Sequence, residues 1–425
     1  MSAAPEPATA ASTPSRAAPL AGVRVIEVSL LGPGAVGTHL ADLGAEVIKV
    51  EPPAGDYIRQ MTWPIIEGSS LLHWHIHRGK KSITLDLRTT EAQEVFRDLV
   101  RDADAVIEAM RPGALARRGL GYEDLREINP SIVFCTISGY GMTGPYANLP
   151  SHGIAYDTWA GIVNPTFNDD GFPYLPEHAS IGIHAGPLFG SLWVLAGIVK
   201  ARATGEGSFL EIAQSDASAA MDWLRSETWK AYERPESEVT GNKSDNYERR
   251  APGTAGMEEG VRYQVYESSD GFILFMASEQ EFWRNFCAGV DRMDMFERWP
   301  GNTYGDHARG NTEMRRELAA IFATRTTAEW VEWSGTVNTT IAPVNSPKTL
   351  ADDPQFQDRF GFLPHETHGA DMISTPLKFI DADLPDPTPA PSAGEHNDEV
   401  LAQVLGYDAA RIAALRDAGA LGEGR

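Results

Sequence analysis

Hydrophobic and polar residues alternate along the first half of the chain in blocks that predict strands followed by helices. The β-branched run 23–28 predicts a strand, the glycine-bearing segment 32–44 a helix, and 45–51 a second strand. The same patterns predict strands at 82–87, 105–108, 132–137 and 209–212, and helices at 90–102 and 186–202. Because strands that alternate with helices form parallel sheets, this half predicts an open α/β domain.

The second half of the chain has a different pattern. The polar stretch 233–260 predicts a linker or loop region. Two strands, 263–267 and 272–276, flank Ser-Ser-Asp-Gly and predict a hairpin. Helical patterns around 279–290 and 312–325 complete a smaller domain, and a proline-rich connector at 385–391 precedes a last helical segment at 397–418.

Composition narrows the class of protein. The 425 residues are 42% hydrophobic and 22% charged, which is typical of globular proteins with about two domains. The formal charge of −23 argues against nonspecific binding to nucleic acid or anionic membranes. We expect residues 1–19 to be a flexible tail, because they lack the apolar centre of a signal peptide, and no apolar run approaches the ~20 residues of a membrane span.

Two cysteines, Cys135 and Cys287, are too few for a disulfide framework and lack the neighbours of a metal site. The sequence therefore predicts a cytoplasmic protein without a bound metal.

A glycine motif follows the first predicted strand. Gly32, Gly34 and Gly37 have the spacing of a dinucleotide-binding turn, and Glu51 ends the second strand, where a ribose-binding carboxylate is expected. Pro33 removes one amide donor from that turn. An NAD(P) oxidoreductase and a plain strand-to-helix turn both remain open on this evidence.

One short segment concentrates positive charge. Residues 73–81 carry Arg78, Lys80 and Lys81 in an otherwise acidic chain. An acidic protein needs such a local cluster to bind a phosphate, although a solvated loop has the same composition.

Ordered blocks of the sequence resemble class III CoA-transferases, the family of formyl-CoA transferase, carnitine CoA-transferase and α-methylacyl-CoA racemase. The similarity runs from residue 20 to about 218 and returns near the C-terminus, whereas 220–330 is only loosely similar. The blocks are Leu40–Glu51, Arg78–Leu87, Arg111–Gly113 with Leu120–Tyr122, Ile137–Tyr146, Thr204–Gly207 and Gly394–Leu401.

The resemblance implies a Rossmann-like large domain from both chain ends, with a small domain between them and two subunits interlocked as a homodimer. On this basis we assign 20–225 and 336–425 to the large domain and 226–335 to the small one. The ligand would be coenzyme A, carried as an acyl-CoA, with a carboxylic acid as second substrate. Its phosphates would be bound by the turn at Gly32 and Gly34 and by Arg78, Lys80, Lys81 and Arg111.

The resemblance fails at the catalytic position. The family places a nucleophilic aspartate shortly after its Gly-Pro-Tyr block, and the matching residue is Gly153. Asp157 follows one helical turn later and is a candidate replacement nucleophile. His152 matches the histidine base of the racemase branch, whose second acid is replaced by Ile183, and the adjacent His184 is a candidate acid or base.

Several functions remain open at this stage. The first is CoA transfer between an acyl-CoA and an acid with an atypical site. The second is racemase-like or other enolate chemistry on His152. The third is a non-catalytic CoA-binding subunit, and the fourth is the NAD(P) oxidoreductase. By analogy with the family's glycine-rich loop, amides of 253–256 would stabilise an oxyanion.

Overall fold

The computed structural model describes residues 18–422, except 242, 244–246, 250–256, 303, 304, 306, 360, 381–383 and 385. Most of the predicted tail and the loop 253–256 therefore lie outside the described residues. The chain forms two compact units, one of residues 1–222 and 360–425 and one of residues 223–359.

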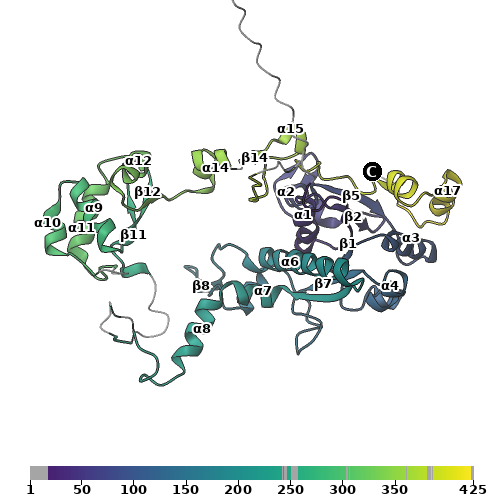
Figure 1. Cartoon of the computed structure of the whole chain (residues 1–425), viewed down its shortest axis with the longest axis horizontal. Coiled ribbons are helices and arrows are strands. Elements are labelled where there is room, and N and C mark those ends of the chain that lie inside the picture. Colours follow the sequence, from purple (N-terminus) through teal and green to yellow (C-terminus); the bar gives the residue numbers. More distant parts are fainter. Residues whose placement is uncertain are drawn as a thin grey trace, which may run out of the picture. The chain divides into compact units, whose positions relative to one another are not determined.

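The first unit is built on a six-stranded parallel sheet (Figure 1). The strand order is β10-β7-β6-β1-β2-β5, which is the 3-2-1-4-5-6 order of the Rossmann fold. The predicted open α/β domain is confirmed. The strands are β1 (Arg24–Val28), β2 (Glu46–Glu51), β5 (Lys80–Thr84), β6 (Ala105–Glu108), β7 (Val133–Ser138) and β10 (Ser208–Ala213).

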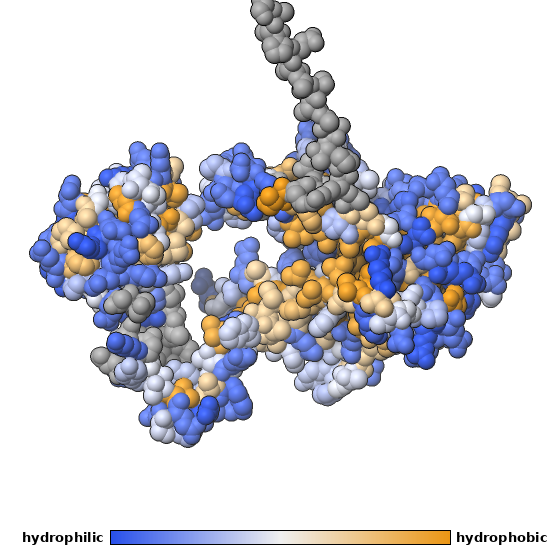
Figure 2. All heavy atoms as spheres, viewed as in Figure 1, coloured by the Kyte–Doolittle hydropathy of each residue, from blue (hydrophilic) through white to orange (hydrophobic). Residues whose placement is uncertain are grey.

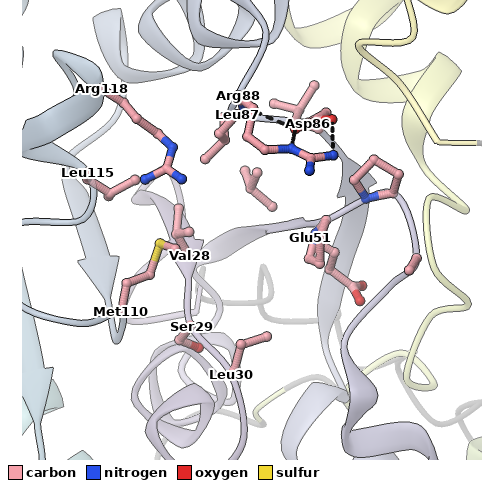
Figure 3. Close-up of a pocket in the computed structure, with 15 residues that line it drawn as sticks. Val28, Ser29, Leu30, Glu51, Asp86, Leu87, Arg88, Met110, Leu115 and Arg118 are labelled. Atoms are coloured by element: carbon pink, nitrogen blue, oxygen red, sulfur yellow. Dashed lines mark hydrogen bonds and ion pairs between the residues drawn. The ribbon is translucent and has the colours of Figure 1, made fainter.

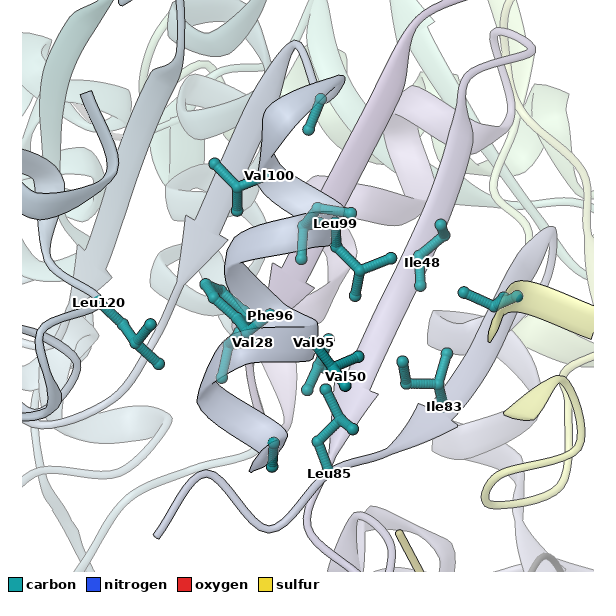
Figure 4. Close-up of a cluster of buried hydrophobic side chains, with 14 of the residues drawn as sticks. Val28, Ile48, Val50, Ile83, Leu85, Val95, Phe96, Leu99, Val100 and Leu120 are labelled. Atoms are coloured by element: carbon teal, nitrogen blue, oxygen red, sulfur yellow. The ribbon is translucent and has the colours of Figure 1, made fainter. Parts of the chain in front are cut away.

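Successive strand residues point to opposite faces of the sheet. Because both faces carry buried hydrophobic residues, helices cover both of them. Val28, Ile48 and Val50 pack with α3 (Thr90–Arg101) in one core (Figure 4). Val25 and Val47 pack with α1 (Ala35–Ala41) and α6 (Ile181–Thr204) in the other. Also in this unit are α2 (Leu71–His77), α4 (Tyr122–Ile128), α5 (Ile154–Trp159) and α7 (Gln214–Met221).

The 24-residue helix α6 is longer than predicted, and by length and hydropathy it would suffice to cross a membrane. Half of its apolar 18-residue window is buried, and glycines on that face allow close packing on the sheet and on α1. A Cβ at Gly197 would lie 2.7 Å from Val133 Cγ1, and one at Gly190 would lie 3.0 Å from Val36 Cγ2. The helix thus packs as a core helix of this unit.

The C-terminal segment returns to the edge strand β5. The side chain of Asn397 accepts a hydrogen bond from Thr84 N (2.8 Å), and Gly394 N donates one to Ser82 Oγ (2.9 Å). The helix predicted at 397–418 is wrong as a single element. It consists of α16 (Asn397–Glu399) with a π-helical turn to Val404, and then α17 (Ala409–Asp417), because Gly406 adopts a positive φ of 67° between them.

The second unit contains a three-stranded antiparallel sheet of β11 (Tyr263–Glu267), β12 (Phe272–Met276) and β13 (Ile341–Pro343). The first two strands form the hairpin that the sequence predicts. Residues 336–359, expected in the large domain, fall in this unit because β13 pairs with β12. Its helices are α8 (Trp223–Tyr232), α9 (Gln280–Gly289), α10 (Met293–Arg298), α11 (Thr312–Phe322), α12 (Thr327–Val337), α13 (Pro347–Ala351) and α14 (Pro354–Arg359).

Candidate functional site

A cavity of about 440 Å³ opens at the carboxyl ends of the parallel strands of the first unit (Figure 3). Its walls follow β1, β2, β5 and β6, so it spans the point between β1 and β6 where the strand order reverses. Ligands of open α/β sheets bind at this point. The lining residues are Val28–Leu30, Val50–Ala54, Leu85–Arg88, Met110, Leu115 and Arg118.

Two arginines lie at this cavity. Arg118 donates from Nη1 to the carbonyl of Ala114 (2.7 Å), which leaves the rest of its guanidinium facing the space. Arg88 pairs with Asp86 through Nη2 and Oδ2 (2.7 Å), and this arginine holds the pKa of Asp86 below its usual range. The sequence analysis missed both, although each follows a predicted strand or the loop after one.

Arg111 is the predicted phosphate ligand with the most accessible position. It is exposed and directly follows Met110 in the cavity wall. Among the described residues, no ion pair involves its side chain.

The other three predicted cations are bound by carboxylates of the protein itself. Arg78 forms a bidentate pair with Asp42 (2.7 and 3.1 Å), and both side chains are only 4% exposed. Lys81 contacts Glu46 and Glu399, each at 2.9 Å.

Lys80 is fully buried, and its Nζ donates to Glu27 Oε2 (2.7 Å) and to the carbonyl of Gly34 (2.6 Å). Burial lowers the pKa of Lys80 to about 8. The structure thus gives this basic cluster a packing role and leaves Lys80 inaccessible to any ligand.

The glycine motif also has an internal explanation. A Cβ on Gly37 would lie 1.9 Å from Glu27 Oε2, and one on Gly34 would lie 3.0 Å from Ile76 Cγ2 and 3.4 Å from Glu27 Oε1. These glycines therefore make room for the buried Glu27 carboxylate and its pair with Lys80.

Glu51, the expected ribose ligand of an NAD site, is already satisfied. Both of its oxygens accept from Arg59 (2.6 and 3.0 Å), and Ser82 Oγ donates to Oε1 (2.6 Å). These partners outweigh burial and lower the pKa of Glu51 to about 2. The two features that suggested NAD are thus accounted for by internal packing.

Gly153, the position of the family's aspartate, lies against Ile183, the position of the racemase's second acid. A Cβ on Gly153 would be 3.6 Å from Ile183 Cγ2, and a Cβ on Gly32 would be 3.7 Å from Ile183 Cβ. The turn after β1, the start of α5 and the start of α6 therefore meet at one place.

Asp157 is fully buried next to this place. Its Oδ1 accepts from Gly182 N in the first turn of α6 and from Ser218 Oγ, both at 2.8 Å. Its Oδ2 lies 3.3 Å from His178 Nε2. The sequence analysis missed His178, whose Nδ1 lies 3.0 Å from the carbonyl of Pro176 and so must carry a proton. Asp157 anchors α6 and His178 and faces no open space.

The two candidate histidines are both exposed. His152 precedes Gly153 and His184 follows Ile183, so the contact between Gly153 and Ile183 brings both into the same region. The predicted oxyanion loop 253–256 lies outside the described residues. Within the part of the chain that the structure describes, no cluster of three or more metal-ligating side chains occurs.

Comparisons with known proteins give one consistent result. The model of CoA-transferase family III matches residues 20–397. The chain is 31% identical to succinate–glutarate CoA-transferase of Agrobacterium fabrum, over 92% of this chain and 97% of that protein. It is 27% identical to human succinyl-CoA:glutarate CoA-transferase, over 94% and 89%. It resembles the crystal structure of a CAIB/BAIF family protein from Brucella suis with a TM-score of 0.73 and 27% identity, covering 92% of this chain and all of that one.

Proposed function

We propose that this chain, which belongs to CoA-transferase family III, transfers coenzyme A from an acyl-CoA to a carboxylic acid through a site with glycine at position 153. The observation that carries the proposal is the strand-end cavity at the topological switch point of a Rossmann-type sheet. The most similar relatives described above are named for transfer between dicarboxylic acids, succinate and glutarate. Small dicarboxylic acids are therefore the first acceptors to test.

The nucleotide end of CoA fits the strand-end cavity chemically. Val28, Leu85 and Leu115 give it apolar walls of the kind that hold an adenine ring. Arg118 and Arg88 lie at its edge, and the exposed Arg111 follows Met110 in its wall. Guanidinium groups bind phosphates in bidentate fashion, so Arg118 and Arg111 are the proposed phosphate ligands, whereas Arg88 is already paired with Asp86.

One loop connects this cavity with the position of Gly153. Ser29 and Leu30 line the cavity, and Gly32 two residues later lies against Ile183. Two residues of chain span at most about 7 Å. A CoA molecule whose nucleotide occupies the cavity would extend its thioester arm along this loop towards Gly153.

The test is a transfer assay with acyl-CoA donors and a panel of carboxylic acids, read by mass spectrometry. CoA should appear on an added acid. Arg118→Ala should raise the Kd for CoA by about 10- to 150-fold, because one charge-assisted phosphate contact contributes about 1.5–3 kcal/mol. Arg117→Ala is the matched control, because this exposed neighbour does not line the cavity. Equal CoA affinity in both variants would contradict the placement of the nucleotide.

Proton transfer at the α-carbon of the thioester is a second candidate function. It is favoured by His152, an exposed imidazole next to Gly153. Running the same assay in D2O separates the two functions, because deuterium would enter the acyl group without movement of CoA. The His152→Gln variant should then lose this exchange.

We also propose that two copies associate. The outer face of α6 exposes Leu188, Leu192, Trp193 and Val199 by 50–70%, and apolar residues gather over this helix in Figure 2. A row of large apolar side chains on one helix is typical of an interface. Sedimentation should give a dimer, and a monomer would contradict this proposal.

A reducing cytoplasm remains the proposed compartment, supported by two buried, free cysteines. Recovery of the protein in an extracytoplasmic fraction would contradict it.

A further inference from the structure

We propose that the acceptor acid supplies the nucleophile itself, by placing its carboxylate in the space over Gly153. This inference rests on the proposed CoA transfer and names the reacting group at the same site. Its basis is the pairing of an open glycine position with a neighbouring aspartate that is fully buried and whose Oδ1 already accepts two hydrogen bonds.

The space over Gly153 is unobstructed. Apart from its chain neighbours, the one described atom within 4 Å of a Cβ built there is Ile183 Cγ2, at 3.6 Å. Several other glycines of this unit face atoms closer than 3.0 Å, as Gly37 and Gly182 do, because the fold packs directly against them. Packing therefore does not explain why position 153 lacks a side chain.

Asp157 does not fill the role of nucleophile. Its carboxylate is completely buried, and Oδ1 already accepts two hydrogen bonds. Its Oδ2 lies 3.3 Å from His178 Nε2, in the same buried environment. Attack by Oδ1 would require breaking its hydrogen bonds with Gly182 N and Ser218 Oγ, and attack by either oxygen would require exposing a completely buried carboxylate.

The surroundings of Gly153 suit a bound carboxylate. His152 precedes it and His184 follows Ile183, and both imidazoles are exposed. A ring N–H of either histidine can donate to a carboxylate oxygen. The neighbouring Ile183 and Gly32 offer no group that would compete as a nucleophile.

The reaction balances without a catalytic carboxylate on the protein. An oxygen of the acceptor attacks the thioester carbon, the C–S bond breaks, and CoA leaves as the thiolate with a mixed anhydride of the two acids. The thiolate then attacks the acyl carbon of the acceptor, the C–O bond breaks, and the donor leaves as its carboxylate. No proton or electron is gained or lost overall. The enzyme contributes positioning, which is worth effective molarities of about 10⁵–10⁸ M in well-oriented systems.

Oxygen labelling in a single turnover tests this inference. Enzyme in excess over acyl-CoA is mixed with acceptor acid that carries ¹⁸O in both carboxylate oxygens. Direct attack leaves the bridging ¹⁸O on the donor, so the released donor acid should carry one label in the first turnover. A carboxylate on the enzyme would instead retain the ¹⁸O and release unlabelled donor acid. Label on the peptide that contains Asp157 would overturn the inference.

Two variants at one position sharpen the result. Gly153→Ala adds only a methyl group at ordinary contact distance from Ile183, so it should fold, keep its Kd for acyl-CoA and lose about 100-fold in kcat/KM for the acceptor. Gly153→Asp should move the label from the donor acid to the enzyme. Unchanged acceptor kinetics in Gly153→Ala would also overturn the inference. Absence of transfer with every acid would refute the proposed function. Transfer with ¹⁸O retained on the enzyme would refute only this inference, so the two failures can be told apart.

Discussion

Replacing Gly37 by alanine should destabilise the protein, although the same change stabilises most helices. Gly37 lies within α1, where alanine is favoured over glycine by about 1 kcal/mol. Here the new Cβ would lie 1.9 Å from Glu27 Oε2 and 3.1 Å from Val47 Cγ1. Glu27 cannot move freely, because Lys80 Nζ contacts the same oxygen at 2.7 Å and neither side chain is exposed.

The expected magnitude is the difference between these two effects. Displacing Glu27 breaks a buried ion pair, and such a loss costs about 3–5 kcal/mol. Subtracting the helix-propensity gain of about 1 kcal/mol leaves a decrease of roughly 2–4 kcal/mol in the free energy of unfolding.

The measurement should follow the first unit alone, because a chain of two units does not unfold in one step. Native-state hydrogen exchange of the amides in β1 and β2 reports its opening free energy. Gly32→Ala is the matched control, since its Cβ would meet no described atom closer than 3.7 Å and exchange should barely change. Amide exchange in Gly37→Ala that is slower than in the wild type, or no faster, would refute the assignment of this glycine to packing.

Three further predictions test the buried charges. Burial raises the pKa of Glu108 to about 7 from 4.5, so the folded state loses stability as pH rises between these two values, where the unfolded carboxyl is ionised and the folded one is still protonated. Glu108→Gln should therefore gain up to about 3 kcal/mol over wild type between pH 4 and pH 8, measured by native-state hydrogen exchange of the first unit. By the same measurement, Arg78→Ala should lower the opening free energy of the first unit by about 3–5 kcal/mol, and Lys81→Ala, at 31% exposure, by about 0–1 kcal/mol. Asp157→Asn should retain transfer within about tenfold, because an amide can still accept from Gly182 N and donate to His178 Nε2; complete loss would indicate a nucleophilic Asp157.

The sequence predicted the elements of the sheet because their signals are local. A β-branched run followed by a glycine turn is sufficient to place β1 and α1, and Ser-Ser-Asp-Gly is sufficient for the hairpin of β11 and β12. The broken C-terminal helix was missed because apolar periodicity continues across Gly406, whose positive φ interrupts it.

The site was harder to predict because its partners are distant in the chain. Arg78 and Lys80 have the composition of a phosphate site, but their carboxylate partners are Asp42 and Glu27, 36 and 53 residues away. Helical spacing placed Asp157 on the same face as Gly153, whereas Ser218, 61 residues later, helps to enclose it. A charge visible in the sequence therefore says little until the structure shows what neutralises it.

The way in which the C-terminal segment completes the first unit has a consequence for synthesis on the ribosome. At the end of the edge strand β5, Thr84 N donates a hydrogen bond to Asn397 Oδ1, and Thr84 Oγ1 accepts one from Gly422 N. These partners are 313 and 338 residues further along the chain. Translation proceeds at about 5–20 residues per second, so this edge stays unpaired for roughly 15–70 seconds after it emerges. The inserted second unit is translated in full during that interval. A nascent chain of this protein therefore presents an uncovered β edge for most of its synthesis, which is when a chaperone has access to it.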